Sequence, residues 1–108
     1  MKILRLGNFS TESKKLYKKY KNIPNDLKAL GKRLNANPKA GIDIGANCYK
    51  IRLENSSIPT GKSGGFRIVY YYYDGESELY LLSIFSKRDM ENISDVRVFE
   101  LLCKYGLE

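Results

Sequence analysis

The sequence of 108 residues predicts an α+β fold, with a small antiparallel sheet packed on helices. Two observations predict it. Apolar residues recur every three or four positions in the first third of the chain and again near its end, which is the spacing of amphipathic helices. Between these regions, apolar residues alternate with charged ones, which is the spacing of half-buried strands. We expect the order β-α-α-β-β-β-α within one domain that covers residues 1–108.

The N-terminal third predicts one strand and two helices. Residues 3–6 are mostly apolar and suit a short strand. A first helix can be capped by Ser10 or Thr11 and runs to about residue 20. Pro24 suits the first turn of a second helix, which ends before the next proline because the preceding residue avoids helical geometry. The buried stripe of this helix consists of Leu27, Leu30 and Leu34.

The rest of the chain predicts three strands and a final helix. Residues 39–47 contain two glycines and show no period, which indicates a loop. Asp74-Gly75 opens a hairpin connection between two of the strands. The final helix is amphipathic, and Ser94-Asp95 could restart it midway. The expected strands are residues 49–54, 66–73 and 79–85, and the expected helix is residues 90–105.

The charge of the chain favours an anionic partner. Lysine and arginine number 19 against 12 acidic residues, so the net charge is +7. A small domain this basic suits a polyanion such as nucleic acid, and general solubility is the alternative explanation. The apolar run of residues 79–85 is too short to span a membrane, and the N-terminus is too short and polar for a signal peptide. We therefore expect a cytoplasmic protein in which Cys48 and Cys103 remain thiols.

The absence of histidine restricts the chemistry. Histidine is the commonest general base and the commonest metal ligand. Any acid–base chemistry must therefore use lysine, tyrosine, arginine-assisted water or carboxylates. Two separate cysteines without histidine also argue against a structural zinc site, and we expect neither a metal nor another cofactor.

Basic residues gather on the expected strands. Alternation places Lys50 and Arg52 on the same face of the sheet. Arg67 can share this face if its strand pairs antiparallel, and Lys87 and Arg88 follow the end of the last strand. Cations that converge in this way would form a phosphate site. The alternative is a solvated strand face with scattered charges, and under either interpretation we expect the strand cations to be exposed.

Other residues are candidates for contact with RNA or the ribosome. Tyr71 and Tyr73 share the parity of Arg67 and could stack on bases, although ordinary sheet packing is favoured for each tyrosine taken singly. Lys62 lies in a glycine- and serine-rich loop that could approach a phosphate backbone. This loop lacks the first glycine and the following helix of a P-loop. The first helix has a basic outer face, formed by Lys14, Lys15, Lys18 and Lys19.

Four segments combine into a family pattern. A strand with two cations at residues 48–53 precedes a glycine-then-arginine strand at residues 61–71 and a strand with a basic exit at residues 79–87. In this combination they resemble the RelE/HigB-type toxins of bacterial type II toxin–antitoxin systems. Residues 37–41 are also similar to the turn that ends the second helix in HigB-like members. The resemblance implies a ribosome-dependent mRNA endoribonuclease that a cognate antitoxin holds inactive.

The resemblance also implies roles for single residues. The RNA 2′-OH attacks the neighbouring phosphate, which requires a base, an acid and stabilisation of the extra negative charge. Lys50 and Arg52 match the two catalytic strand cations, and Lys50 is the better base because arginine stays protonated. Arg67 would clamp the phosphate. Arg88 or Lys87 would stabilise the transition state or assist the leaving group.

The chain departs from the RelE pattern near its end. The best-studied members place a catalytic tyrosine where this chain has Ser94, and the nearest tyrosine beyond is Tyr105. Either another group acts there, as in HigB-like members, or activity is weak. Two other functions stay open: a ParE-type inhibitor of DNA gyrase, a class that usually lacks the paired strand cations, and a non-catalytic RNA- or ribosome-binding module.

Overall fold

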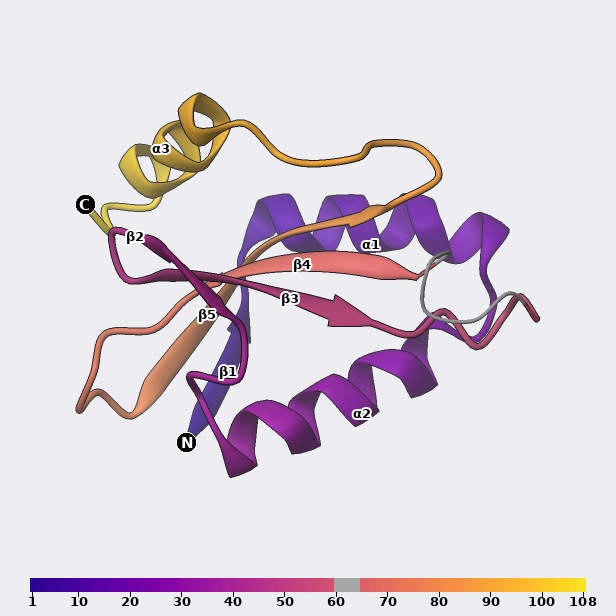
Figure 1. Ribbon diagram of the computed structural model, residues 1–108, viewed down its shortest axis with the longest axis horizontal. Coiled ribbons are helices and arrows are strands. Elements are labelled where there is room, and N and C mark those ends of the chain that lie inside the picture. Colours follow the sequence, from indigo (N-terminus) through magenta and orange to yellow (C-terminus); the bar gives the residue numbers. More distant parts are fainter. Residues whose placement is uncertain (60–64) are drawn as a thin grey trace.

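The computed structural model describes residues 1–59 and 65–108, and within them it contains three helices and five strands (Figure 1). This architecture confirms the predicted α+β class, the two N-terminal helices and the final helix. No helix in the described ranges is long and apolar enough to cross a membrane. The elements are β1 (Lys2–Arg5), α1 (Gly7–Lys19), α2 (Ile23–Ala36), β2 (Ile42–Gly45), β3 (Cys48–Leu53), β4 (Phe66–Tyr71), β5 (Glu78–Ser86) and α3 (Asp95–Lys104).

The strands form one mixed sheet in the order β1-β5-β4-β3-β2. The neighbours from β2 to β5 pair antiparallel, which the sequence predicts for β3, β4 and β5. β1 instead pairs parallel with β5, with Lys2 opposite Glu78. The parallel pair joins segments from opposite parts of the chain, so local patterning does not specify it.

β2 corrects the prediction of a loop at residues 39–47. Residues Ile42–Gly45 pair with β3 through a tight turn in which Ala46 and Asn47 both have positive φ angles, of 54° and 62°. Two successive residues with positive φ are typical of a type I′ hairpin turn. All four residues of β2 are exposed. The strand therefore lacks the alternation of buried apolar and exposed residues by which a strand is recognised in a sequence.

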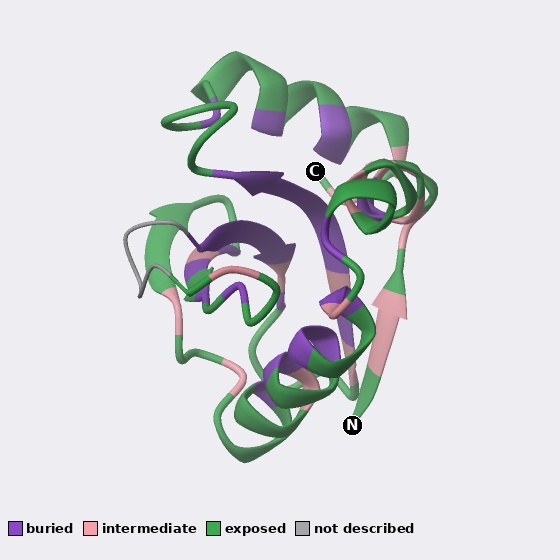
Figure 2. Ribbon diagram, turned by 90° about the vertical axis from the view of Figure 1, so that its right-hand side faces the viewer, coloured by how far each residue is buried: buried purple, intermediate pink, exposed green. Residues whose placement is uncertain are grey.

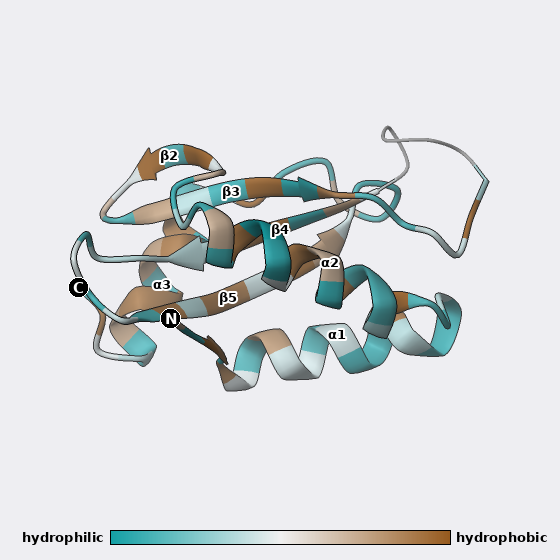
Figure 3. Cartoon of the chain, turned by 90° about the horizontal axis from the view of Figure 1, so that it is seen from below, coloured by the Kyte–Doolittle hydropathy of each residue, from teal (hydrophilic) through white to brown (hydrophobic). Residues whose placement is uncertain are grey.

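Helices cover both faces of the sheet. On one face, α1 and α2 contribute Phe9 and Leu30 to a core cluster that includes Tyr70. On the other face, α3 contributes Leu101 to a second cluster that includes Val69. Figure 2 shows the buried positions along the strands and on the inner sides of the helices, and Figure 3 shows hydrophobic positions along β4 and β5. The central strands are thus buried on both sides.

The four consecutive tyrosines divide between the two faces, as alternation predicts. Tyr70 and Tyr72 belong to the cluster under α1 and α2. Tyr71 packs against the cluster under α3, whereas Tyr73 is 53% exposed. Tyr70 is completely buried and stacks on Tyr49, with 5.2 Å between the ring centroids. The buried pair therefore contributes to stability rather than to a binding surface.

α3 begins at Asp95 and not at residue 90, which corrects the predicted start of the final helix. Ser94 caps the helix, because its Oγ accepts a hydrogen bond of 3.1 Å from the backbone N–H of Arg97. Residues 87–94 form turns and irregular structure instead. Figure 1 shows this segment as the long orange loop that leads from β5 back to α3.

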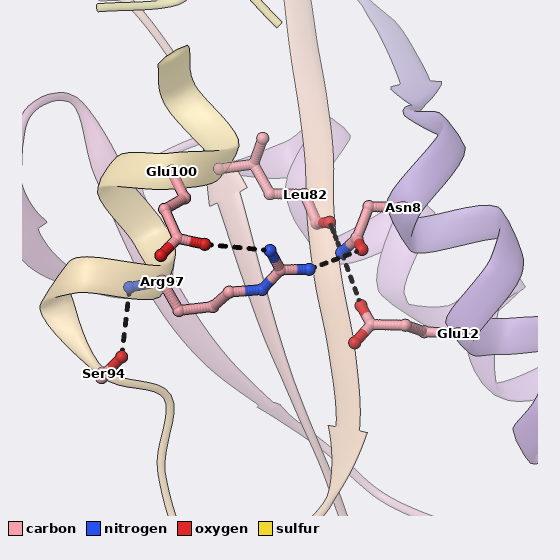
Figure 4. Close-up of polar contacts among 6 residues, drawn as sticks. All are labelled: Asn8, Glu12, Leu82, Ser94, Arg97 and Glu100. Atoms are coloured by element: carbon pink, nitrogen blue, oxygen red, sulfur yellow. Dashed lines mark hydrogen bonds and ion pairs between the residues drawn. The ribbon is translucent and has the colours of Figure 1, made fainter. Parts of the chain in front are cut away.

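Polar contacts join α3 to α1 and β5 (Figure 4). The guanidinium of Arg97 donates to Oδ1 of Asn8 over 3.0 Å. Nδ2 of Asn8 donates to the carbonyl of Leu82 over 2.9 Å and to Oε1 of Glu12 over 2.8 Å. These contacts fix α3 over the face of the sheet that also carries the strand cations.

The two cysteines should differ in their reactivity. Both are thiols; Cys48 is buried and Cys103 is exposed. Burial, followed by the charge of Asp43, raises the pKa of Cys48 to about 11. Because the thiolate is the reactive form, we expect iodoacetamide at pH 8.5 to modify Cys103 and to modify Cys48 only after unfolding. Peptide mass spectrometry would measure this, and equal modification of both thiols in the folded protein would contradict the packing of β3.

A cationic cleft as candidate functional site

The pairing of β3 with β4 brings three cations onto one face of the sheet. Arg52 lies directly opposite Arg67, and Lys50 lies opposite Val69. Since side chains alternate along a strand, Lys50, Arg52 and Arg67 all project from the side that α3 covers. The neighbouring Ile51 belongs to the core under α1 and α2. The alternation in the sequence predicts the shared face of Lys50 and Arg52, and the antiparallel pairing of β4 adds Arg67 to it.

These cations line a cleft of about 530 Å³. One side of the cleft is formed by β2, β3 and β4, and the other by the segment that follows β5. The cleft contains four cationic side chains and one carboxylate among the described residues. Its volume lies within the range of pockets that bind small molecules, which is about 300–1,000 Å³. The lining residues are Ile42, Lys50, Ile51, Arg52, Arg67, Lys87, Glu91 and Asn92.

Arg67 is buried, which corrects the expectation of an exposed strand cation. The residue as a whole is 6% exposed, and its Nη1 donates to the carbonyl of Phe66 over 3.2 Å. Burial, followed by repulsion from Arg52, lowers the pKa of Arg67. Its guanidinium nevertheless stays charged, because arginine does not lose its proton in proteins.

Among the residues that the structure describes, Arg67 has no carboxylate partner that would balance its charge. The two ion pairs within residues 1–59 and 65–108, Lys39–Asp74 and Arg97–Glu100, include none of the cations that line the cleft. A buried charge without a counter-charge costs free energy. An anion that enters the cleft would relieve this cost and accept hydrogen bonds from the planar guanidinium.

Lys50 connects β3 to the segment that follows β5. Its Nζ donates to Oδ1 of Asn92 over 2.8 Å. The same oxygen accepts the backbone N–H of Ile93 over 2.9 Å, so the amide of Asn92 is held in place. Arg33 on α2 steadies the same strand, because its Nη1 donates to the carbonyl of Arg52 over 2.8 Å. The positions of both strand cations are therefore supported by neighbouring elements.

The two basic residues after β5 occupy different places. Lys87 lines the cleft, and its backbone N–H donates to the carbonyl of Gly65 over 3.2 Å. Arg88 is exposed and is absent from the lining of the cleft within the described ranges. Of these two candidates, the structure brings Lys87 to the other cations.

The remaining candidates lie elsewhere or outside the described residues. Tyr71 and Tyr73 lie toward the other end of β4, where they line a second cavity of about 310 Å³ with Glu76, Glu78, Tyr80 and Leu107. Lys62 lies outside the described residues. The four lysines of α1 are exposed, on the helix that covers the opposite face of the sheet from the cleft: Lys14, Lys15, Lys18 and Lys19.

Sequence reasoning missed Glu91 and Asn92. Both lie in the segment that was expected to be helical, and a helical period gives no reason to single them out. Ser94, which occupies the position of the catalytic tyrosine in the RelE pattern, caps α3 instead. The hydroxyl of Tyr105 accepts the backbone N–H of Asn8 over 2.7 Å, at the start of α1. Neither residue supplies a hydroxyl to the lining of the cleft.

The comparison with solved structures shows a RelE-like fold. No protein-family model matches the chain. A structure of the toxin RelE from E. coli, a mutant with two arginines replaced by alanine and in the free state, is similar with a TM-score of 0.58. The match covers 83% of this chain and 86% of that chain at 22% sequence identity. At this identity the likeness establishes the fold, and the activity of the chain has to be argued from its site.

Proposed function

We propose that this chain is the toxin of a bacterial toxin–antitoxin pair and that it cleaves mRNA on the ribosome in the cytoplasm. The observation that carries the proposal is Arg67, a buried guanidinium that has no carboxylate partner among the described residues. It lines the cleft together with three more cations of the described ranges. The fold of the toxin RelE supports the same function. An RNA phosphate is the anion that such a cleft would accept.

The proposed reaction needs neither a metal nor histidine. The 2′-oxygen attacks the neighbouring phosphorus, the bond from phosphorus to the 5′-oxygen breaks, and the products carry a 2′,3′-cyclic phosphate and a 5′-hydroxyl. Arg67 binds the non-bridging oxygens, and Lys50 and Arg52 stabilise the added charge. Lys87 faces the cleft and is better placed than Arg88 to stabilise the leaving group. The ribosome would supply the orientation of the RNA, so we expect little cleavage of naked RNA.

Two assays separate this function from the alternatives. Cleavage of mRNA in a translating extract would distinguish an endoribonuclease from a gyrase inhibitor and from a plain RNA-binding module. A DNA gyrase supercoiling assay would detect a ParE-type activity on the same fold. The cationic lining of the cleft favours the endoribonuclease, because gyrase inhibition gives no reason for four cations to converge there.

A cognate antitoxin is part of the proposal. It should present acidic residues to the cations and apolar residues to the surface beside them. Ile44 and Phe99 are 37% and 59% exposed and line a groove between β2 and α3. Ile42, which is 70% exposed, lines the neighbouring cleft. An antitoxin could thus inhibit by covering the cleft, or by blocking ribosome binding at the outer surface.

The basic face of α1 is our candidate for contact with ribosomal RNA. Lys15 and Lys18 are exposed on the side of the sheet opposite the cleft. Replacing both by glutamate should weaken ribosome binding and flatten its salt dependence, because fewer counterions are released on binding. Sedimentation with ribosomes across a salt titration would measure this. Unchanged affinity at every salt concentration would remove α1 from the binding surface.

A further inference from the structure

The cleft contains one carboxylate among its described lining residues, and the reaction as described above does not use it. Glu91 lines the cleft together with Lys50, Arg52, Arg67 and Lys87. Within residues 1–59 and 65–108, neither of the two ion pairs includes Glu91. An acidic side chain opposes the binding of RNA phosphates by repulsion. The presence of Glu91 among the cations therefore suggests a role in the reaction itself.

The proposed cleavage needs a proton acceptor that a lysine- and arginine-lined cleft lacks. Arginine stays protonated, and an ordinary lysine is almost entirely protonated at neutral pH. The chain contains no histidine, and the described lining includes no tyrosine. A carboxylate is ionised at neutral pH and can accept a proton without first losing one.

We infer that Glu91 is the general base of the proposed reaction, an inference that rests on the proposed function. Its carboxylate takes the proton of the RNA 2′-OH as the 2′-oxygen bonds to phosphorus. The bond to the 5′-oxygen breaks, and that oxygen takes a proton from the ammonium of Lys50. Glu91 ends protonated and Lys50 neutral. Glu91 then gives its proton to water and Lys50 takes one from water, which restores both groups. Lys50 is then the acid of the reaction and not its base.

The segment around Glu91 is anchored on both sides. Before it, the backbone N–H of Met90 donates to the carbonyl of Ser86 over 3.1 Å. After it, Asn92 accepts the hydrogen bond from Lys50, and Ile93 is buried in the core under α3. The hydrogen bond between Lys50, the proposed acid, and Asn92 therefore holds Lys50 next to the chain neighbour of Glu91, the proposed base. This anchoring limits how far Glu91 can move from the cleft, as a general base requires.

The test compares Glu91→Gln with the parent in the ribosome-dependent cleavage assay. Glutamine keeps the shape and removes the proton acceptor, so single-turnover cleavage should fall about 10²- to 10⁴-fold, the usual contribution of one general acid or base. Glu91→Asp should retain part of the rate.

Asp89→Asn is the matched control, because Asp89 is an exposed carboxylate of the same segment outside the described lining of the cleft. It should cleave like the parent. If Glu91→Gln cleaves as fast as the parent or faster, while Arg67→Ala is impaired, Glu91 merely repels RNA and the inference is wrong, although the proposed function stands. If the parent cleaves no mRNA on ribosomes, the proposed function itself is wrong.

Discussion

Replacement of Arg67 by alanine should lower ribosome-dependent mRNA cleavage by about 10²- to 10³-fold, the range seen when one transition-state donor is lost. Arg67 is the buried cation of the cleft, and repulsion from Arg52 adds to the effect of burial on its pKa. Its guanidinium is therefore held in a site of reduced solvent access, where a hydrogen bond to a charged phosphate is stronger than in water. Single-turnover cleavage of a defined mRNA on saturating ribosomes would measure the loss.

Two further variants show whether the geometry or the charge of Arg67 matters. Arg67→Lys keeps the charge and removes the planar fork, so it should recover only part of the rate. Lys104→Ala removes one exposed cation at the end of α3 and should cleave like the parent. Arg67→Ala should not destabilise the fold, because it removes a buried charge that has no carboxylate partner within residues 1–59 and 65–108. Cleavage by Arg67→Ala at the parental rate would exclude the phosphate clamp.

Replacement of Tyr70 by alanine should lower the free energy of unfolding by about 3–5 kcal/mol, as for other large aromatic residues in a core. Tyr70 is completely buried and stacks on Tyr49. Its hydroxyl donates to the carbonyl of Pro38 over 2.8 Å and accepts the N–H of Gly41 over 3.0 Å. Tyr70 thus ties the connection between α2 and β2 to the centre of the sheet. Urea denaturation followed by circular dichroism would measure the change.

The neighbouring tyrosine is a control of the same residue type. Tyr73 is 53% exposed, so Tyr73→Ala should leave the stability nearly unchanged. Tyr70→Phe keeps the ring and leaves two backbone groups without their partner, which should cost about 1–3 kcal/mol. Equal losses for Tyr70→Ala and Tyr73→Ala would show that the two tyrosines do not divide between core and surface.

The sequence predicted the parts of the fold and site that follow from period and parity. Alternation along β3 was sufficient to place Lys50 and Arg52 on one face, whereas the place of Arg67 on that face depended on the antiparallel pairing and register of β4. Helical spacing found α1 and α2, and the residues Ser94-Asp95 marked the place where α3 begins. Each of these conclusions depends on interactions between residues that are close in sequence or paired in a simple antiparallel ladder.

The features that the sequence did not predict depend on tertiary context. β2 is held by backbone pairing and has no buried apolar residues, so the sequence shows no alternation that would identify it as a strand. The burial of Arg67 depends on tertiary packing, since the segment after β5 lines the cleft on the other side from its strand. Glu91 lines the cleft from the irregular segment of residues 87–94. Irregular backbone leaves no helical or strand periodicity in the sequence, so its position could not be predicted. Tyr71 and Tyr73 have the predicted parity but lie too far along the strand to join the cations.

The most direct test of the proposed function is the chemistry of the RNA ends that the purified protein produces. A defined mRNA would be incubated with the protein, with and without programmed ribosomes, and the fragments would be analysed for their end groups. We expect cleavage only with ribosomes, with a 2′,3′-cyclic phosphate on the upstream fragment and a 5′-hydroxyl on the downstream fragment. Intact mRNA on ribosomes, or fragments with a 5′-phosphate, would contradict attack by the 2′-OH within the cationic cleft.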